Sequence, residues 1–166
     1  MKNRSINMLI VALLVIGAMA VTLVVFLLHA KERFPEDITV VEDGVTETIL
    51  PIRDLMLNPT ESREYSVNLF CMASGGYYVY LDFEETEDGG MKPFVDVTVK
   101  VDGELLYEGK LDALLAPDAA TVDCEVELYA EEARVFTVTY TMPRDVGNEA
   151  QGTYADFDLT LRIKKS

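Results

Sequence analysis

Few side chains in this 166-residue sequence could act as a nucleophile or a base. There is one histidine, His29, and there are two cysteines, Cys71 and Cys124. A Ser-His-Asp or Cys-His arrangement needs an imidazole beside the nucleophile, but His29 directly follows a long apolar run, away from the rest of the chain. Paired carboxylates could hydrolyse a glycosidic bond, yet most acidic residues alternate with apolar ones, as on a solvated sheet face. The sequence therefore predicts a protein that is not an enzyme.

Two acidic loops carry the oxygen ligands that calcium prefers, Glu84–Gly90 (EETEDGG) and Arg144–Glu149 (RDVGNE). Neither has the spacing D-x-[DN]-x-[DN]-G of a calcium-binding loop. Acidic residues with glycine also form ordinary turns that need no metal. The sequence predicts no cofactor, and calcium is the alternative.

Two neighbouring aromatic residues suggest a different ligand chemistry. Tyr78 and Tyr80 lie on the polar side of one alternating segment, where aromatic side chains could stack on sugar rings. Aromatic side chains on a wet sheet face are also common cross-strand packing pairs. The packing interpretation is favoured unless the two tyrosines line a groove.

The charge of the chain limits its partners. It holds 14 Lys and Arg against 29 Asp and Glu, a formal net charge of −15. Binding to nucleic acid needs clustered Lys and Arg against the phosphates. The sequence therefore excludes nucleic acid as a partner and favours protein partners or a cation.

Strands must position these residues, because apolar residues recur at every second position through most of residues 38–163. Nine segments are expected to be strands: 38–42, 45–50, 64–73, 77–85, 94–101, 104–109, 121–128, 135–142 and 154–163. The turn sequences Asp43-Gly44, Ser74-Gly75-Gly76 and Asp102-Gly103 separate successive segments. Only Lys110–Leu115 (KLDALL) suggests a turn of helix. This pattern predicts an all-β fold, an antiparallel two-sheet sandwich of about nine strands with jelly-roll or immunoglobulin-like topology.

The two cysteines fall on the inward face of their predicted strands. A disulfide between Cys71 and Cys124 would join the two layers and stabilise the fold by about 2–4 kcal/mol. Alternatively, both are buried thiols that behave as small apolar side chains. The sequence leaves both open.

The N-terminal region contains an uncharged apolar run from Met8 to Leu28. A helix of that length would span a hydrocarbon core of about 30 Å, whereas a secretory leader has an apolar stretch of about 7–15 residues. The expected organisation is a cytoplasmic head (1–7), a transmembrane signal-anchor (8–30), a linker (31–37) and an extracellular β-sandwich domain (38–166). The alternative is a cleaved leader, with sites of small-x-small form near Ala20 and Ala30, and a secreted product.

Two short elements carry a resemblance to a known family. The first is Leu57-Asn58-Pro59-Thr60-Glu61-Ser62, and the second is Asn148-Glu149-Ala150-Gln151-Gly152 before the last strand. In order and spacing, residues 45–163 resemble the camelysin/TasA-type family of bacterial secreted surface and biofilm-matrix proteins. Thr60 replaces the glycine of the family's first element. The loop residues Asn148, Gln151 and Gly152 match its second element.

The resemblance implies a subunit of a surface or matrix fibre, which assembles when the N-terminal strand of one subunit completes a sheet of the next. The segment that could be donated here is Ile38, Thr39, Val40, Val41 and Glu42. The metalloprotease activity described for camelysins is not carried over, because this sequence offers no histidine for such a site.

Together these observations predict a membrane-tethered extracellular structural or interaction module of a bacterial cell envelope, a matrix-fibre subunit or its anchor assembling by strand donation. The alternative is a stand-alone binding module for a cation, a cell-wall glycan or a protein ligand.

Overall fold

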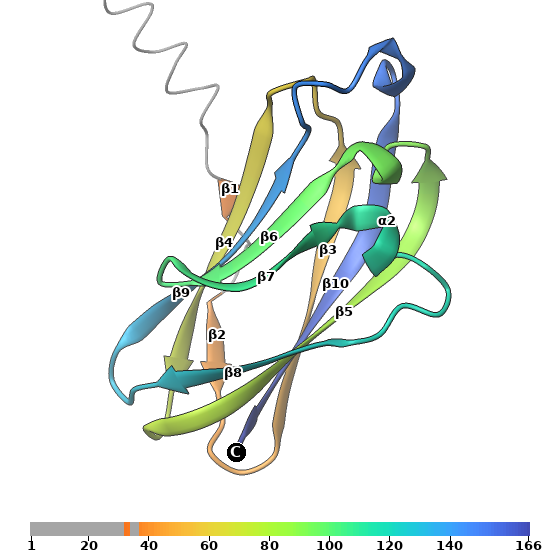
Figure 1. Cartoon of the computed structure of the whole chain (residues 1–166). Helices are drawn as coiled ribbons and strands as arrows, with labels where there is room; N and C mark the ends of the chain where they lie inside the picture. Colours follow the sequence, from red (N-terminus) through yellow and green to blue (C-terminus); the bar gives the residue numbers. More distant parts are fainter. Residues whose placement is uncertain (1–31, 34–36) are drawn as a thin grey trace, which may run out of the picture. The chain divides into compact units, whose positions relative to one another are not determined.

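The alternating segments of the chain form two sheets in the computed structural model (Figure 1). The structure describes residues 32–33 and 37–166. The predicted head (1–7) and apolar segment (8–30) lie outside the described residues. Within the described ranges, no helix is long and apolar enough to cross a membrane.

One sheet has six strands, in the order β1-β4-β9-β6-β7 with β2 also paired to β4. These strands are β1 (Glu32–Arg33), β2 (Ile38–Val40), β4 (Ser62–Cys71), β6 (Asp96–Val101), β7 (Glu104–Lys110) and β9 (Ala133–Thr141). The other sheet has four strands, in the order β3-β10-β5-β8. These are β3 (Val45–Leu55), β5 (Gly75–Gly89), β8 (Val122–Leu128) and β10 (Tyr154–Lys165). Short helical turns lie in the connections: η1 (Lys92–Phe94), α2 (Leu111–Leu114) and η2 (Asn148–Ala150).

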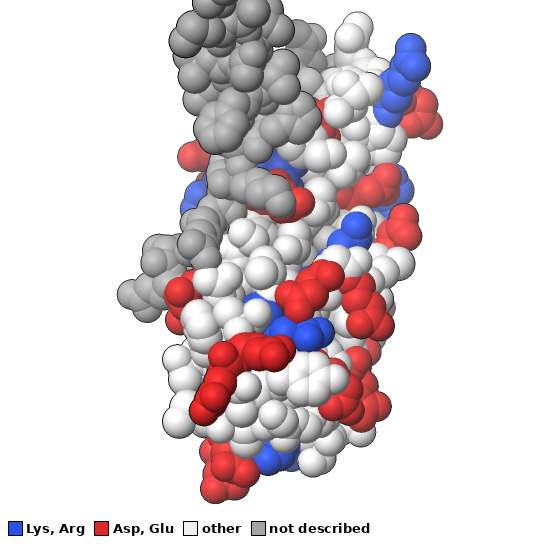
Figure 2. Space-filling view, turned by 90° about the vertical axis from the view of Figure 1, so that its left-hand side faces the viewer, with Lys and Arg blue, Asp and Glu red and all other residues white. Residues whose placement is uncertain are grey.

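The core consists of the inward residues of both sheets. β9 and β10 are interior strands, and every second residue is buried from Phe136 to Tyr140 in β9 and from Ala155 to Ile163 in β10. The rings of Tyr140 and Phe157 meet edge to face with centroids 5.4 Å apart. The intervening residues are polar and face solvent, and Figure 2 shows one face on which acidic side chains form several patches with basic side chains between them. The period of two in the sequence is therefore the alternation of core and solvent.

The predicted all-β two-sheet sandwich is confirmed, and the nine expected segments correspond to β2 through β10. The expected helical turn at Lys110–Leu115 is α2. The finer assignment to a jelly-roll or immunoglobulin-like topology stays a prediction.

The pairing of the first two strands differs from the expected antiparallel arrangement. β1 and β2 both run parallel to β4. A parallel pair needs a connection that crosses over, and here β3, which lies in the other sheet, is that connection. Glu32–Arg33, inside the predicted linker 31–37, thus belong to the six-stranded sheet.

The predicted donor segment is docked in its own chain. The register pairs Ile38 with Leu69 and Val40 with Cys71, and both β2 side chains are buried. The carbonyl of Val40 accepts a hydrogen bond from the N–H of Met72 at 3.2 Å. The segment Ile38–Val40 therefore already completes one edge of its own sheet.

The two cysteines are free thiols, so the disulfide that the sequence left open is not formed. Cys71 forms an isolated bridge to Ala130, whereas Cys124 pairs with Val79 inside β8. Cys71 thus lies on the six-stranded sheet and Cys124 on the four-stranded sheet. Burial raises the pKa of both thiols, so they remain protonated at neutral pH.

β3 is an edge strand, and its composition suits that position. Pro51 pairs with Asp158 of β10, and proline has no N–H to donate to a second neighbour. Next to it, Arg53 Nη1 donates to the carbonyl of Phe157 at 2.7 Å, and Nη2 contacts the Asp158 carboxylate at 2.5 Å. These contacts fix β3 against β10 near the end of the sandwich that carries the β3–β4 turn.

The hydroxyl of Tyr140 is buried and has no hydrogen-bond partner among the described residues. Burial raises its pKa well above the usual value, so it stays neutral. Because an unpaired buried polar group costs about 1–3 kcal/mol, we expect Tyr140→Phe to raise the free energy of unfolding by about 1 kcal/mol. Urea denaturation of the two proteins measures this difference. A loss of stability instead would mean that the hydroxyl has a buried water as partner.

Candidate functional site

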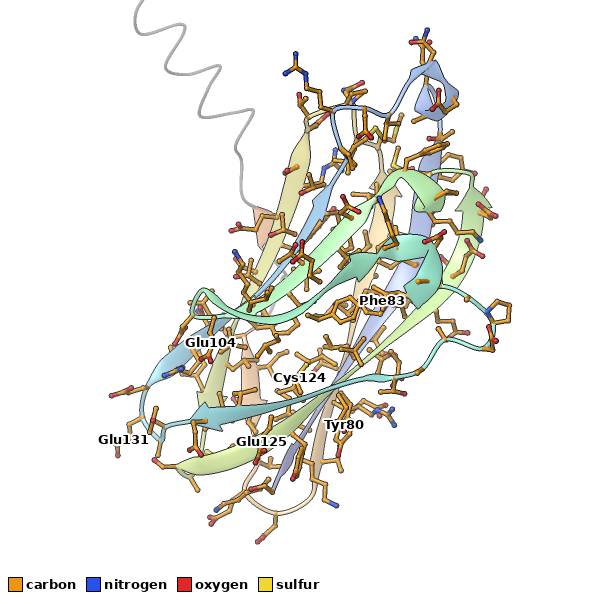
Figure 3. The ribbon with its side chains drawn as sticks, viewed as in Figure 1. Tyr80, Phe83, Glu104, Cys124, Glu125 and Glu131 are labelled. Atoms are coloured by element: carbon orange, nitrogen blue, oxygen red, sulfur yellow. The ribbon has the colours of Figure 1, made fainter. Side chains whose placement is uncertain are left out.

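The outer face of the four-stranded sheet brings two tyrosines together with residues of opposite charge. The register places Tyr80 of β5 between Arg162 of β10 and Asp123 of β8. The adjacent row places Tyr78 between Lys164 and Glu125. In Figure 3 the labelled Tyr80 and Glu125 lie on the side of the sheet opposite Cys124 and Phe83. Each tyrosine thus has a cation on one side and an acid on the other.

This face is hollowed by a groove of about 410 Å³. Its lining, called the sheet groove below, consists of Val45, Tyr80, Thr121, Asp123, Arg162 and Lys164. The ring of Tyr78 continues it, with its centroid 6.3 Å from that of Tyr80 and the ring planes inclined by 35°. The condition that both tyrosines line a groove is met for Tyr80 alone, whereas Tyr78 packs beside it outside the lining.

The guanidinium of Arg162 is held in place by the Asp82 carboxylate. The other carboxylate oxygen of Asp82 accepts a hydrogen bond from the Thr121 hydroxyl at 2.5 Å. Arg162 Nε has no hydrogen-bond acceptor among the described residues. Asp82 therefore orients the guanidinium beside Tyr80, and the unpaired Nε is buried rather than exposed in the groove.

Two further groups of the sheet groove are free to bind a ligand. No hydrogen bond or ion pair within the described chain involves the side chains of Lys164 and Asp123, which are exposed. An ammonium group donates hydrogen bonds and a carboxylate accepts them. The sheet groove therefore offers an aromatic face, a fixed guanidinium, a free donor and a free acceptor, a set suited to a ring that carries several hydroxyl groups.

A second hollow, of about 320 Å³, is lined by the β3–β4 turn and the β9–β10 loop. Both connections lie at the upper end of the molecule in Figure 1. Its lining, called the end pocket below, consists of Met56, Leu57, Asn58, Pro59, Val146, Gly147, Asn148, Ala150, Gln151, Gly152 and Thr153. Both elements that carry the family resemblance contribute to it, and so do the predicted loop residues Asn148, Gln151 and Gly152. The two elements that carry the resemblance are far apart in the sequence but line one pocket.

The walls of the end pocket are fixed by hydrogen bonds. Glu61 Oε2 accepts from both the backbone N–H and the side-chain amide of Asn58, each at 2.9 Å. In the other wall, the N–H of Gln151 donates to the carbonyl of Asn148 at 3.0 Å. The hydroxyl of Thr153 donates to the carbonyl of Ala150 at 2.8 Å. The pocket is therefore largely formed before any ligand arrives.

The acidic loops considered for calcium use their carboxylates otherwise. Lys92 Nζ contacts Glu85 at 2.7 Å and Asp88 at 3.1 Å. Hydrogen bonds from the Gly90 N–H and from Lys92 lower the pKa of Asp88, and hydrogen bonds to Glu85 and Asp88 raise the pKa of Lys92. In the described residues no group of three or more His, Cys, Asp or Glu side chains is placed to hold a metal ion. The predicted loop Glu84–Gly90 is not a loop, because β5 continues to Gly89. Lys92 pairs with two of its carboxylates, at the place where a calcium ion would have to bind.

In the second acidic loop, the Glu149 carboxylate folds back and accepts from the N–H of Gly147 at 3.1 Å. This loop instead supplies one wall of the end pocket.

Several groove and pocket residues were not predicted as site residues from the sequence. The alternation in the sequence indicates only that three of these residues lie on the polar side of their strands: Asp123, Arg162 and Lys164. The strand order is what places them beside the tyrosines. Asn58 belongs to the first element of the family resemblance, and its sequence context indicates no role in binding. A polar side chain that lies beside an exposed aromatic side chain on a neighbouring strand can be recognised as part of a site only when the register between the strands is known.

No protein-family model matches this chain, and no curated protein matches it. Solved structures of similar shape include a β-glucosidase from Paenibacillus barengoltzii (11% identity, 80% of this chain and 11% of that chain covered, TM-score 0.34). They also include the C-terminal CBM6 of LamC, a marine laminarinase from Zobellia galactanivorans (12% identity, 74% and 100% covered, TM-score 0.39). A third is a family 35 carbohydrate binding module from Clostridium thermocellum (8% identity, 76% and 96% covered, TM-score 0.40). At these TM-scores and identities the similarity says nothing about what this chain binds.

Proposed function

We propose that the domain is a binding module for a glycan, and that the sheet groove is its binding surface. The single observation that supports this most is the position of Tyr80, which lines a groove beside a fixed arginine and a free lysine. A sugar ring has an apolar face that stacks on an aromatic ring and hydroxyl groups around its rim that need donors and acceptors. The sheet groove supplies both kinds of contact from rigid strands.

The proposed ligand is an extended polysaccharide of a cell envelope, because the polar residues of the sheet groove lie in two adjacent rows across the sheet. Tyr78 and Tyr80 would each stack on one sugar unit, and Arg162 would hold hydroxyl groups between them. The charges of Arg162 and Asp82 compensate each other, and Lys164 and Asp123 add one charge of each sign. A neutral glycan therefore suits the groove.

We expect Tyr80→Ala to weaken glycan binding by at least about tenfold, since a loss of about 1.4 kcal/mol of stacking has that effect. Calorimetry with soluble β-glucan, xylan and wall-derived glycan strands measures the affinity. Tyr129→Ala is the matched control, because Tyr129 is 45% exposed but lies after β8, outside the sheet groove. Absence of binding to every glycan in the panel, or an equal loss in the two variants, would contradict the proposal.

We further propose that the module acts outside the cytoplasm, tethered through the apolar segment 8–30. This placement rests on the length of the uncharged run from Met8 to Leu28 in the sequence. The N-terminal residue of the mature protein, with fractionation of membrane and medium, tests it. A chain that begins near Val21 or Lys31 in the medium would replace the anchor by a leader.

A second candidate function, assembly by exchange of β2 between copies, is favoured by one observation. β2 is only three residues long, and the short strand β1 before it pairs with β4 separately. Nevertheless β2 places the side chains of Ile38 and Val40 in the core. The contacts that β2 makes with its own β4 could equally be made with the β4 of another copy, as in domain swapping. This candidate agrees with the fibre subunit implied by the family resemblance.

A further inference from the structure

The end pocket is uncharged in a strongly acidic protein. The chain holds 29 Asp and Glu residues, yet none of the residues that line the end pocket is charged. The carboxylates of Glu61 and Glu149 adjoin the lining, where they accept hydrogen bonds from Asn58 and Gly147. The lining itself thus offers shape and hydrogen-bonding groups, which suit a neutral ligand.

Two carboxamides at the end pocket are free. Asn148 and Gln151 are exposed, and no hydrogen bond within the described residues involves their side chains. Each carboxamide carries an N–H₂ donor beside a carbonyl acceptor. A secondary amide has the complementary pair of groups, so it can form two hydrogen bonds with one such side chain.

The floor of the end pocket is aliphatic. Leu57 and Ala150 are buried, and Val146 is packed against the core. A small apolar group of the ligand would bury its surface there. An acetamido group joins a secondary amide to a methyl group, which matches the carboxamides at the rim and the floor beneath them.

The volume sets the size of the ligand. At about 320 Å³ the end pocket is at the lower end of the range of small-molecule sites, about 300–1,000 Å³. It therefore accepts one sugar unit and not a chain of several. It lies at the end of the sandwich formed by the β3–β4 turn and the β9–β10 loop, and shares no lining residue with the sheet groove.

We propose that the end pocket is a second, independent binding site that takes a single N-acetylated hexosamine unit. Its methyl group lies on Leu57, Ala150 and Val146, and its amide pairs with the side chains of Asn148 and Gln151. This site does not depend on the sheet groove or on the ligand of that groove.

Two-dimensional NMR of the full chain tests the proposal. N-acetylglucosamine is the probe, and glucose is the matched control sugar. We expect saturable shifts at residues 146–153, including the side-chain amide signals of Asn148 and Gln151, with N-acetylglucosamine and not with glucose. Gln151→Ala should weaken this binding at least about fivefold, and Tyr80→Ala should leave it unchanged. Asn68→Ala on β4 is the control for loss of a carboxamide away from the end pocket.

Three results would overturn the proposal. They are equal shifts with both sugars, shifts confined to the sheet groove, and binding of N-acetylalanine methylamide without binding of N-acetylglucosamine. The last result would assign the end pocket to a peptide. Because Tyr80→Ala and Gln151→Ala act on different sites, a failure here leaves the test of the sheet groove independent.

Discussion

Replacing Val40 with aspartate is expected to detach β2 from the sheet and to lower the free energy of unfolding by about 3 kcal/mol or more. The Val40 side chain is 0% exposed, so the substitution removes its apolar contacts and places a carboxylate in the core. The core of the described residues contains no buried charged side chain that could pair with it. Either the carboxylate stays protonated or β2 leaves the sheet.

Thr39→Asp is the matched control, because Thr39 lies on the same strand and is exposed. A surface substitution of this kind changes stability by about 0.5 kcal/mol or less. Urea denaturation of the three proteins measures both effects. Equal stability of V40D and the wild type would contradict the docking of β2 against β4.

The V40D variant also tests the exchange of β2 between copies. Loss of β2 uncovers the β4 edge, and a peptide of residues 37–44 added to the variant should then bind there and restore stability. Sedimentation of the wild type over a range of concentrations completes the test. If the peptide has no effect and the wild type stays monomeric, exchange of β2 is not a function of this protein.

A second large loss of stability is expected for Phe157→Ala, about 3–5 kcal/mol. Phe157 is 0% exposed on β10, which pairs with both β3 and β5. Its ring contacts those of Tyr140 at 5.4 Å and Phe83 at 6.2 Å, so truncation leaves a cavity between the sheets. With a total stability of about 5–15 kcal/mol for a typical domain, the variant should be close to unfolding at room temperature.

Phe70→Ala is the control for the loss of a phenylalanine, since Phe70 lies on β4 and is 39% exposed. Its stability should change by less than about 1 kcal/mol. Thermal unfolding followed by circular dichroism compares the two variants. A similar small change in both would mean that the space left by Phe157 is filled by its neighbours.

The strands were predictable because each has one buried and one wet face. In β6 the inward Val97, Val99 and Val101 alternate with polar residues, as expected from the sequence. The turn Asp102-Gly103 was also predictable, since both residues have positive φ, +48° and +83°, as a two-residue hairpin requires. Local composition decides features of this kind.

Features decided by a distant neighbour were not predictable. β5 continues to Gly89, beyond the expected end at Glu85, because β10 provides a partner as far as Tyr154. The parallel docking of β2 depends on which edge of which sheet is open, and periodicity contains no information about that.

The candidate sites divide in the same way. The outward direction of Tyr78 and Tyr80 follows from the alternation in their segment, so their exposure was expected. The groove beside them depends on the order β10-β5-β8, which brings Arg162 and Asp123 to either side. The end pocket required the β3–β4 turn and the β9–β10 loop to meet at one end of the sandwich, which no local signal in either element indicates.

Pro51 has a consequence for the behaviour of the protein at high concentration. A flat, open strand edge is a template for aggregation, because another molecule can add a strand to it. β3 is a long edge strand with exposed Val45 and Ile49, so it would carry that risk. A missing donor in the middle of β3 interrupts any ladder that forms along it. Proline within an edge strand is one of the features by which natural sheets discourage the addition of a further strand.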